Sequence, residues 1–167
     1  MKEVTIEITT YCPEKCDYCS TKASDKNVKN LSFENIKAFI DRESPDIINI
    51  SGGEPLAHPQ FYKILTYCQE VAEVVWLYTN AVSNIRFNSD IHPKGIKTHA
   101  NTVVREGSIN IPPADKVHLL ELKEHGRAKN NQLKPVKATM SGHGCSKCNH
   151  KVLQANNKET MPCRKEY

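Results

Sequence analysis

The stretch EVTIEITTYCPEKCDYCS, residues 3–20, joins an alternating segment directly to a loop with three cysteines. Val4, Ile6 and Ile8 alternate with polar residues, which is the period of a β-strand with one buried face. Three cysteines then follow within eight residues, at positions 12, 16 and 19. The stretch predicts a strand that ends in a cysteine loop. Taken alone it leaves three kinds of site open: a disulfide framework, a zinc site or an iron–sulfur cluster.

Composition narrows these alternatives. The chain has 167 residues, of which 38% are hydrophobic and 25% charged, as in a globular domain with one core. No apolar run is long enough for a membrane span, and the N-terminus resembles no signal peptide, so we expect a cytoplasmic protein. Structural disulfides are rare in that compartment. Seven cysteines, six of them in two triplets, therefore favour metal sites over disulfides.

The net charge of +4 is mildly basic, which suits an anionic substrate or cofactor. It falls short of the clustered lysine and arginine typical of nucleic-acid binding. We therefore expect no nucleic-acid partner and no membrane partner.

Residues 3–79 predict a β–α–β–α–β order. Ser32 is the expected N-cap of a first helix, which ends at Ser44-Pro45. Residues 46–51 and 74–79 are short apolar runs and predict buried strands. The helix between them is expected to hold Pro59 in its first turn and to bury one apolar stripe: Phe61, Ile64, Leu65, Cys68, Val71 and Ala72. This order is typical of a parallel sheet with crossover helices.

Beyond residue 80 the pattern weakens. A short strand is expected at 102–105 and a better one at 117–122, and residues 125–138 predict a loop. No internal repeat or low-complexity segment interrupts the chain. The C-terminal residues from 141 carry the second cysteine triplet, so residues 125–140 are the expected linker.

Two further motifs follow the second and third predicted strands. SGGEP (51–55) and YTN (78–80) would lie at the same sheet edge as the first cysteine loop, because parallel strands end together. Glycines let a backbone approach a ligand closely, and the residue before Pro55 is expected to be extended. A loop with only three thiolates leaves one iron of a [4Fe–4S] cluster open for a ligand.

These motifs together resemble the radical SAM (S-adenosylmethionine) superfamily. The resemblance implies that Cys12, Cys16 and Cys19 bind a [4Fe–4S] cluster whose open iron holds the methionine part of SAM. It implies that Tyr18 lies near the adenine and that Gly52, Gly53, Glu54 and Pro55 hold the SAM amino group. Thr79 and Asn80 are expected to line the same site, although Ala81 replaces the glycine usual after them.

The second triplet is Cys145-x2-Cys148-x14-Cys163. Its outline, with a turn at Asn156-Asn157 and a Pro-Cys ending, resembles the C-terminal motif of GTP 3′,8-cyclase of molybdenum-cofactor biosynthesis and related radical SAM proteins. That resemblance implies an auxiliary [4Fe–4S] cluster that holds or orients substrate. A zinc site completed by His143 or His150 is the alternative.

Other candidates are weaker. Arg127, in a glycine turn after the last predicted strand, is a candidate for binding a SAM carboxylate or an anionic substrate, and Arg164 for reaching the same pocket. His58 is expected to cap a loop or lie at the surface, and Cys68 to be a core residue. No acid–base pair identifies a catalytic residue.

The fold class implied is α/β: a truncated radical SAM partial (β/α) barrel of about five strands, with a small C-terminal cysteine-rich iron–sulfur module. The expected domains are 1–124, the truncated core, and 125–167, the linker and auxiliary-cluster segment.

The resemblance implies an enzyme that cleaves SAM to a 5′-deoxyadenosyl radical, which takes hydrogen from a small, nucleotide-like molecule or a peptide. The electron would come from a reductant such as ferredoxin or flavodoxin. One alternative is an activase that makes a glycyl radical on a partner protein. Another is a non-catalytic iron–sulfur or zinc module.

Overall fold

The computed structural model describes residues 1–17, 19, 21–79, 99–104, 116–121 and 151–160. The chain divides into two compact units. The first holds Met1–Lys15, Thr21–Ala81 and Gly144–Tyr167, and the second holds Cys16–Ser20 and Val82–His143.

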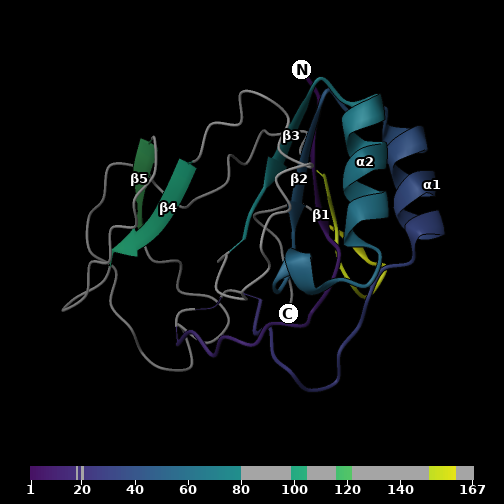
Figure 1. Ribbon diagram of the computed structural model, residues 1–167. Helices are drawn as coiled ribbons and strands as arrows, with labels where there is room; N and C mark the ends of the chain where they lie inside the picture. Colours follow the sequence, from purple (N-terminus) through teal and green to yellow (C-terminus); the bar gives the residue numbers. More distant parts are fainter. Residues whose placement is uncertain (18, 20, 80–98, 105–115, 122–150, 161–167) are drawn as a thin grey trace. The chain divides into compact units, whose positions relative to one another are not determined.

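The first unit contains the predicted β–α–β–α–β order. Strands β1 (Glu3–Glu7), β2 (Ile47–Ser51) and β3 (Val74–Leu77) are parallel, with β2 between β1 and β3. Helices α1 (Phe33–Glu43) and α2 (Phe61–Val71) are the crossovers, and Figure 1 shows both on the same face of the sheet. The parallel sheet predicted from the sequence is confirmed.

Helix α1 begins and ends as predicted. The Ser32 side chain accepts a hydrogen bond from the Asn35 N–H at 3.2 Å, which caps the first turn. At the other end Ser44 takes a left-handed conformation, φ 44°, and its N–H bonds the Ile40 carbonyl. Pro45 follows and cannot continue the helix.

Helix α2 differs from its prediction in two details. Phe61, Ile64 and Cys68 are buried, but Val71 is 44% exposed, so the apolar stripe is narrower than expected. Pro59 lies in the turn before the helix rather than in its first turn, because the short 3₁₀ helix η1 (Pro55–Ala57) and its turn occupy that stretch.

Strands β6 (Lys151–Leu153) and β7 (Glu159–Thr160) extend the first sheet. β6 pairs in parallel with β1, and β7 pairs antiparallel with β6, which makes the order β3-β2-β1-β6-β7. The turn between them contains Asn157 at φ 64° and agrees with the predicted turn at Asn156-Asn157. Residues assigned by sequence to a C-terminal module thus contribute two strands to the core sheet. The expected boundary between residues 124 and 125 lies outside the described residues and stays a prediction.

The second unit contains strands β4 (His99–Val104) and β5 (Lys116–Glu121), paired in parallel. Both overlap strands that the sequence predicts. No helix in the described ranges is long and apolar enough to cross a lipid bilayer.

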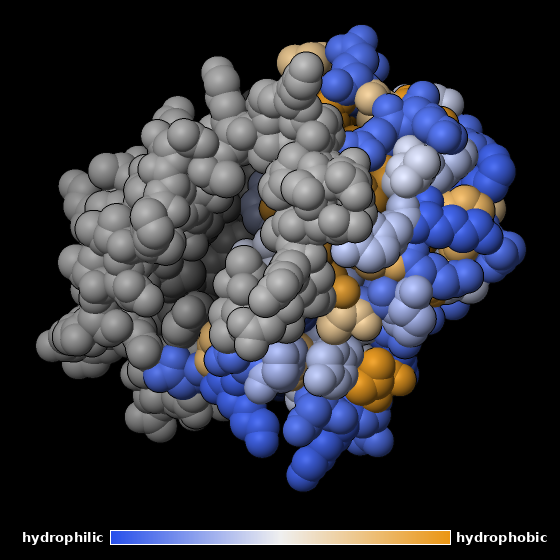
Figure 2. Space-filling model, viewed as in Figure 1, coloured by the Kyte–Doolittle hydropathy of each residue, from blue (hydrophilic) through white to orange (hydrophobic). Residues whose placement is uncertain are grey.

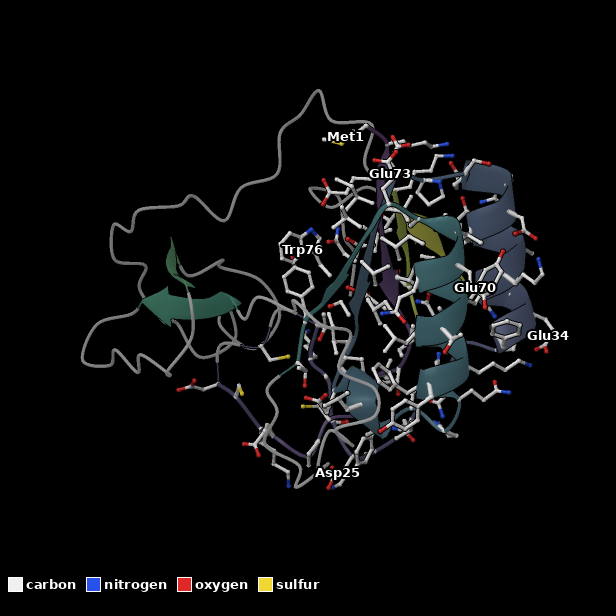
Figure 3. The ribbon with its side chains drawn as sticks, turned by 45° about the horizontal axis from the view of Figure 1, so that its top comes forward. Met1, Asp25, Glu34, Glu70, Glu73 and Trp76 are labelled. Carbon is white, nitrogen blue, oxygen red and sulfur yellow. The ribbon has the colours of Figure 1, made fainter. Side chains whose placement is uncertain are left out.

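The two faces of the first sheet differ in chemistry. The face under α1 and α2 carries fully buried aliphatic side chains from β1 and β2: Val4, Ile6, Ile48 and Ile50. Thr5, Asn49 and Trp76 are paired in register and alternate with those residues, so they lie on the opposite face. Figure 3 shows Trp76 on the side of β3 away from the helices. The outward surface of the helices is mainly hydrophilic (Figure 2).

Candidate functional site

The GGEP segment lies against the chain that leads into the first cysteine loop. Beyond the end of β1, the Gly53 N–H donates to the Thr9 carbonyl at 2.7 Å, and the Glu54 N–H donates to the Tyr11 carbonyl at 2.6 Å. These bonds continue the pairing of β1 with β2 past the strand ends. The prediction that the two motifs meet at the carboxyl edge of the sheet is confirmed for this part of the chain.

The two glycines are required by this backbone contact. Gly52 has φ +140°, and a Cβ there would lie 2.6 Å from the Thr9 carbonyl oxygen. A Cβ on Gly53 would overlap the Tyr11 carbonyl. The close approach visible in the structure is therefore between two segments of the same chain. The approach of a ligand to the GGEP segment stays a prediction.

Glu54 connects the ends of β2 and β3. Its side chain is 2% exposed, and its backbone is extended, as expected before Pro55. The Oε1 atom accepts hydrogen bonds from the Leu56 N–H at 3.1 Å and from the Thr79 hydroxyl at 2.7 Å. Two residues predicted for one site, from different strands, are thus brought together, and Pro55 is buried beside them in η1.

A returning loop supports the entry to the cysteines. The Thr9 hydroxyl donates to Asn30 Oδ1 at 2.6 Å, and the Cys12 N–H donates to the Ser24 carbonyl at 3.1 Å. Sequence reasoning missed Thr9, Ser24 and Asn30, because residues 20–30 carry no periodicity that distinguishes a docked loop from a free one. Their contacts hold the backbone of Cys12, whose side chain is 6% exposed.

The cysteines of the first loop are thiols rather than disulfides. The Cys19 N–H donates to the Cys16 carbonyl at 3.2 Å, which forms a tight turn, and both side chains are half-buried. Cys12 belongs to the first unit, and the other two belong to the second. Among the described residues, no three His, Cys, Asp or Glu side chains form a group that could hold a metal ion. Three thiols are suitable ligands for an iron–sulfur cluster. That Cys12, Cys16 and Cys19 bind one cluster together stays a prediction.

Several predicted site residues lie outside the described residues: Tyr18, Asn80, Arg127, Cys145, Cys148, Cys163 and Arg164. Their roles stay predictions.

His58 connects two loops through its ring nitrogens, which agrees with the prediction that it caps a loop. Its ring is 5% exposed. Nδ1 accepts from the Gln60 N–H at 3.0 Å, so Nε2, 3.0 Å from the Leu31 carbonyl, is the protonated nitrogen. Burial lowers the pKa of His58, which favours this neutral form.

Cys68 is a core residue, as predicted. Its side chain is fully buried on α2, and burial raises the pKa of its thiol to about 12. A thiol in that state is a poor nucleophile and a poor metal ligand.

Known proteins resemble this chain over the region that contains the first cysteine loop and the GGEP segment. The family model for the Radical SAM superfamily matches residues 6–126. The chain is also 31% identical over 86 residues to the PqqA peptide cyclase of Bradyrhizobium diazoefficiens. That alignment covers 48% of this chain and 21% of the cyclase, so the chain matches about a fifth of that relative. The family match spans more than half of the 167 residues and includes the first cysteine loop, the GGEP segment and the ends of β2 and β3. The chain therefore belongs to the radical SAM superfamily.

Proposed function

We propose that this protein is an enzyme that cleaves SAM reductively and uses the resulting radical to take a hydrogen atom from a substrate. The proposal rests on the hydrogen bonds that connect the segments at the carboxyl edge of the first sheet. There the GGEP segment pairs with the chain entering the cysteine loop, and Glu54 bonds Thr79 from the next strand. Membership of the radical SAM superfamily supports SAM cleavage as the chemistry at this edge.

Cys12, Cys16 and Cys19 would hold the [4Fe–4S] cluster. Three thiols supply three ligands and leave one iron for SAM. When bound, the cluster supplies the electron that splits SAM into methionine and a 5′-deoxyadenosyl radical. The bond from Cys12 N–H to the Ser24 carbonyl fixes the backbone at the first ligand before any cluster binds.

The SAM pocket would be lined by residues that follow β1, β2 and β3: Tyr18, Gly52, Gly53, Glu54, Pro55, Thr79 and Asn80. Arg127, which follows β5 in the sequence, would bind a SAM carboxylate or an anionic substrate. The Glu54 carboxylate is held in one orientation by the Leu56 N–H and the Thr79 hydroxyl. A buried acceptor held in this way is preorganised, so little ordering is left for ligand binding to complete. The chain would thus orient SAM and exclude water from the radical.

Cys145, Cys148 and Cys163 would form a second centre that holds or orients substrate, with zinc as the alternative to iron and sulfide. The β6–β7 hairpin supports it. Val152 pairs with Thr160, so the start of β6 and the end of β7 face the same end of the hairpin. Cys148 precedes β6 by three residues and Cys163 follows β7 by three, so both would extend from the same end of the hairpin, although fourteen residues separate them in the sequence.

We propose a peptide substrate in preference to a small, nucleotide-like molecule. The relative in B. diazoefficiens is by name a peptide cyclase, which favours this choice. The reductant would be a ferredoxin or flavodoxin, and the setting an anaerobic cytoplasm. A protein partner that presents the peptide fits the same scheme.

The test is anaerobic reconstitution followed by iron, sulfide and zinc counts and a SAM-cleavage assay. We expect about eight irons per chain, falling to about four in the Cys12/Cys16/Cys19→Ala triple variant. We also expect 5′-deoxyadenosine to form after chemical reduction in the parent protein but not in this variant. Cys68→Ala is the matched control, since a buried core thiol should leave both the iron count and the cleavage unchanged.

Three other outcomes would change the proposal. About four irons with one zinc would make the second centre a zinc site. Iron without SAM binding or cleavage would contradict the enzyme and favour a non-catalytic module. Cleavage that requires a stable partner protein, with a glycyl radical formed on it, would favour an activase.

A further inference from the structure

The chain that leads from β1 to the first cysteine lies between two other segments of the first unit. On one side is the GGEP segment, which donates two backbone hydrogen bonds to it. On the other side is the returning loop, residues 21–31. The Thr10 N–H donates to the Lys29 carbonyl at 2.9 Å, and the Leu31 N–H donates to the Ile8 carbonyl at 2.9 Å. The entry to the cysteine loop is therefore hydrogen-bonded along both of its edges.

Thr9 binds to all three segments. It is 1% exposed, and its carbonyl accepts from the Gly53 N–H at 2.7 Å. Its hydroxyl donates to Asn30 Oδ1 in the returning loop at 2.6 Å and accepts from the Tyr11 N–H at 3.0 Å. A hydroxyl has one hydrogen to donate, so the bond to Asn30 fixes its rotation and leaves its oxygen as the acceptor for Tyr11. Thr9 thus connects the GGEP segment and the returning loop to the chain that enters the cysteine loop.

His58 connects the returning loop to the GGEP segment by a second path. It follows η1, which begins at Pro55 of that segment, and its Nε2 donates to the Leu31 carbonyl at 3.0 Å. The Leu31 N–H in turn donates to the Ile8 carbonyl. The GGEP segment, the returning loop and the chain between them are therefore linked in a closed ring of hydrogen bonds. A shift of one segment breaks its bonds to the other two.

In the proposed function, SAM contacts both sides of this arrangement. Its methionine part would bind the cluster held at Cys12, and the GGEP segment would hold its amino group. A ligand held at two places binds more weakly when their spacing changes, and a displacement of about 1 Å can cost on the order of 100-fold in rate. The bonds of Thr9 lie between Cys12 and Gly53 in this network, so they control that spacing.

We propose that Thr9 is a positioning residue for SAM: its hydroxyl, held by Asn30, maintains the spacing between the GGEP segment and the first cluster ligand. The inference rests on the proposed function, because it takes SAM to be the ligand at this edge. It deepens that function by assigning control of SAM affinity to a residue outside the SAM pocket. It also gives the returning loop a role in the site.

The first measurement follows amide hydrogen exchange by NMR in the metal-free, full-length protein. Thr9→Val removes the hydroxyl and keeps the shape of the side chain, and Thr9→Ser keeps the hydroxyl. We expect the N–H groups of Gly53 and Tyr11 to exchange at least tenfold faster in Thr9→Val than in the parent, and near the parent rate in Thr9→Ser. Thr66→Val, at an exposed threonine on α2, should leave both exchange rates unchanged.

The second measurement determines iron content and SAM affinity, by equilibrium dialysis, in the reconstituted, unreduced proteins. We expect Thr9→Val to keep the iron content of the parent and its Kd for SAM to rise about tenfold, with recovery in Thr9→Ser. Glu43→Gln is the stability control, because it breaks ion pairs of α1 with Lys2 and Lys151, away from the carboxyl end of β1. A merely structural role of Thr9 would weaken SAM binding to the same extent in both destabilised variants.

Three results would each overturn the inference: unchanged exchange at Gly53 in Thr9→Val, unchanged SAM affinity in an iron-loaded Thr9→Val protein, or equally weakened binding in Glu43→Gln. Asn30→Ala, which removes the acceptor at an exposed residue, replaces Thr9→Val if the latter does not fold or take up iron, and the same two effects are expected of it. SAM binding that is equal in the parent and the variant rejects only this inference. A parent protein that takes up iron but binds no SAM rejects the proposed function, and the role of Thr9 with it.

Discussion

Gly52 and Gly53 determine how closely the chain after β2 can lie against the chain after β1. The backbone bonds from Gly53 and Glu54 to the carbonyls of Thr9 and Tyr11 exist only because no Cβ stands between the two segments. The glycines are thus as much a packing requirement of the sheet edge as a feature of a ligand site.

Gly53→Ala tests this role. The new methyl group would overlap the Tyr11 carbonyl, which is backbone and cannot turn away. We expect the free energy of unfolding to fall by about 3 kcal/mol, measured by urea unfolding followed through Trp76 emission. Gln69→Ala, on the exposed face of α2, should change it by less than about 0.5 kcal/mol. A Gly53→Ala protein as stable as the parent would show that the segment can shift without cost.

The bond between Thr79 and Glu54 gives a second prediction. Thr79→Val removes one donor from a carboxylate that is 2% exposed. The loss should destabilise the protein by about 1–3 kcal/mol and weaken SAM binding. Thr79→Ser keeps the hydroxyl and is the matched control. Urea unfolding and equilibrium dialysis with SAM measure the two effects, and equal behaviour of the Val and Ser variants would contradict the role of the hydroxyl.

At the scale of elements, Glu43 joins three parts of the first unit. It ends α1, is 4% exposed, and binds Lys2 before β1 and Lys151 at the start of β6. Arg42 beside it reaches Glu159 of β7 at 2.5 Å. One buried carboxylate therefore connects a helix, the first strand and the C-terminal hairpin. Its bond from Lys151, followed by those from Lys2 and Arg42, lowers the pKa of Glu43 to about 2 against the opposing effect of burial.

This pKa predicts acid sensitivity. The folded pKa is below the ordinary value of 4.5, so the stabilisation is complete above pH 4.5 and is lost as the pH falls toward 2. The lost free energy amounts to at most about 3 kcal/mol. We expect the stability difference between the parent and Glu43→Gln to shrink over this range in urea unfolding of the metal-free proteins. The Glu70→Gln variant, at an exposed glutamate, is measured in parallel as the matched control, and a constant difference for Glu43→Gln would disprove the assignment.

At the scale of the whole molecule, the first sheet is built from both ends of the sequence. β1 lies between β2 and β6, and β6 comes from residue 151 onward. Val152 and Leu153 are 1% and 4% exposed, so they are part of the core. The segment that carries the second cysteine triplet therefore also has a structural role, because it contributes two strands to the sheet.

Deleting residues 144–167 separates that role from metal binding. The deletion removes the buried side chains of Val152, Leu153 and Ala155 and unpairs one side of β1, so we expect the free energy of unfolding to fall by about 3–6 kcal/mol. The Cys145/Cys148/Cys163→Ala variant keeps β6 and β7 and should stay within about 1 kcal/mol of the parent when both are metal-free. Equal losses in the two proteins, measured by urea unfolding, would show that β6 contributes little.

The local order of the chain could be predicted well from its sequence. The spacing of apolar residues predicted β1, α1, β2, α2 and β3. The alternation of strands and helices then implied a parallel sheet with the first cysteine loop, SGGEP and YTN at its carboxyl edge. These features are local in sequence, and side chains at fixed spacing are enough to specify them. The weaker strands β4 and β5 were also marked by their apolar residues.

The sequence by itself determined the family, the strand–helix order and the candidate ligands, since each depends on residue types at short spacings. Only the tertiary structure decided that β6 pairs with β1, that Glu54 meets Thr79, and that Thr9 and Asn30 hold the loop. These contacts join residues that are 21 to 147 positions apart, and no local pattern records them. They arise from the packing of the whole chain, in which burial and hydrogen bonding choose among many pairings that the sequence alone permits.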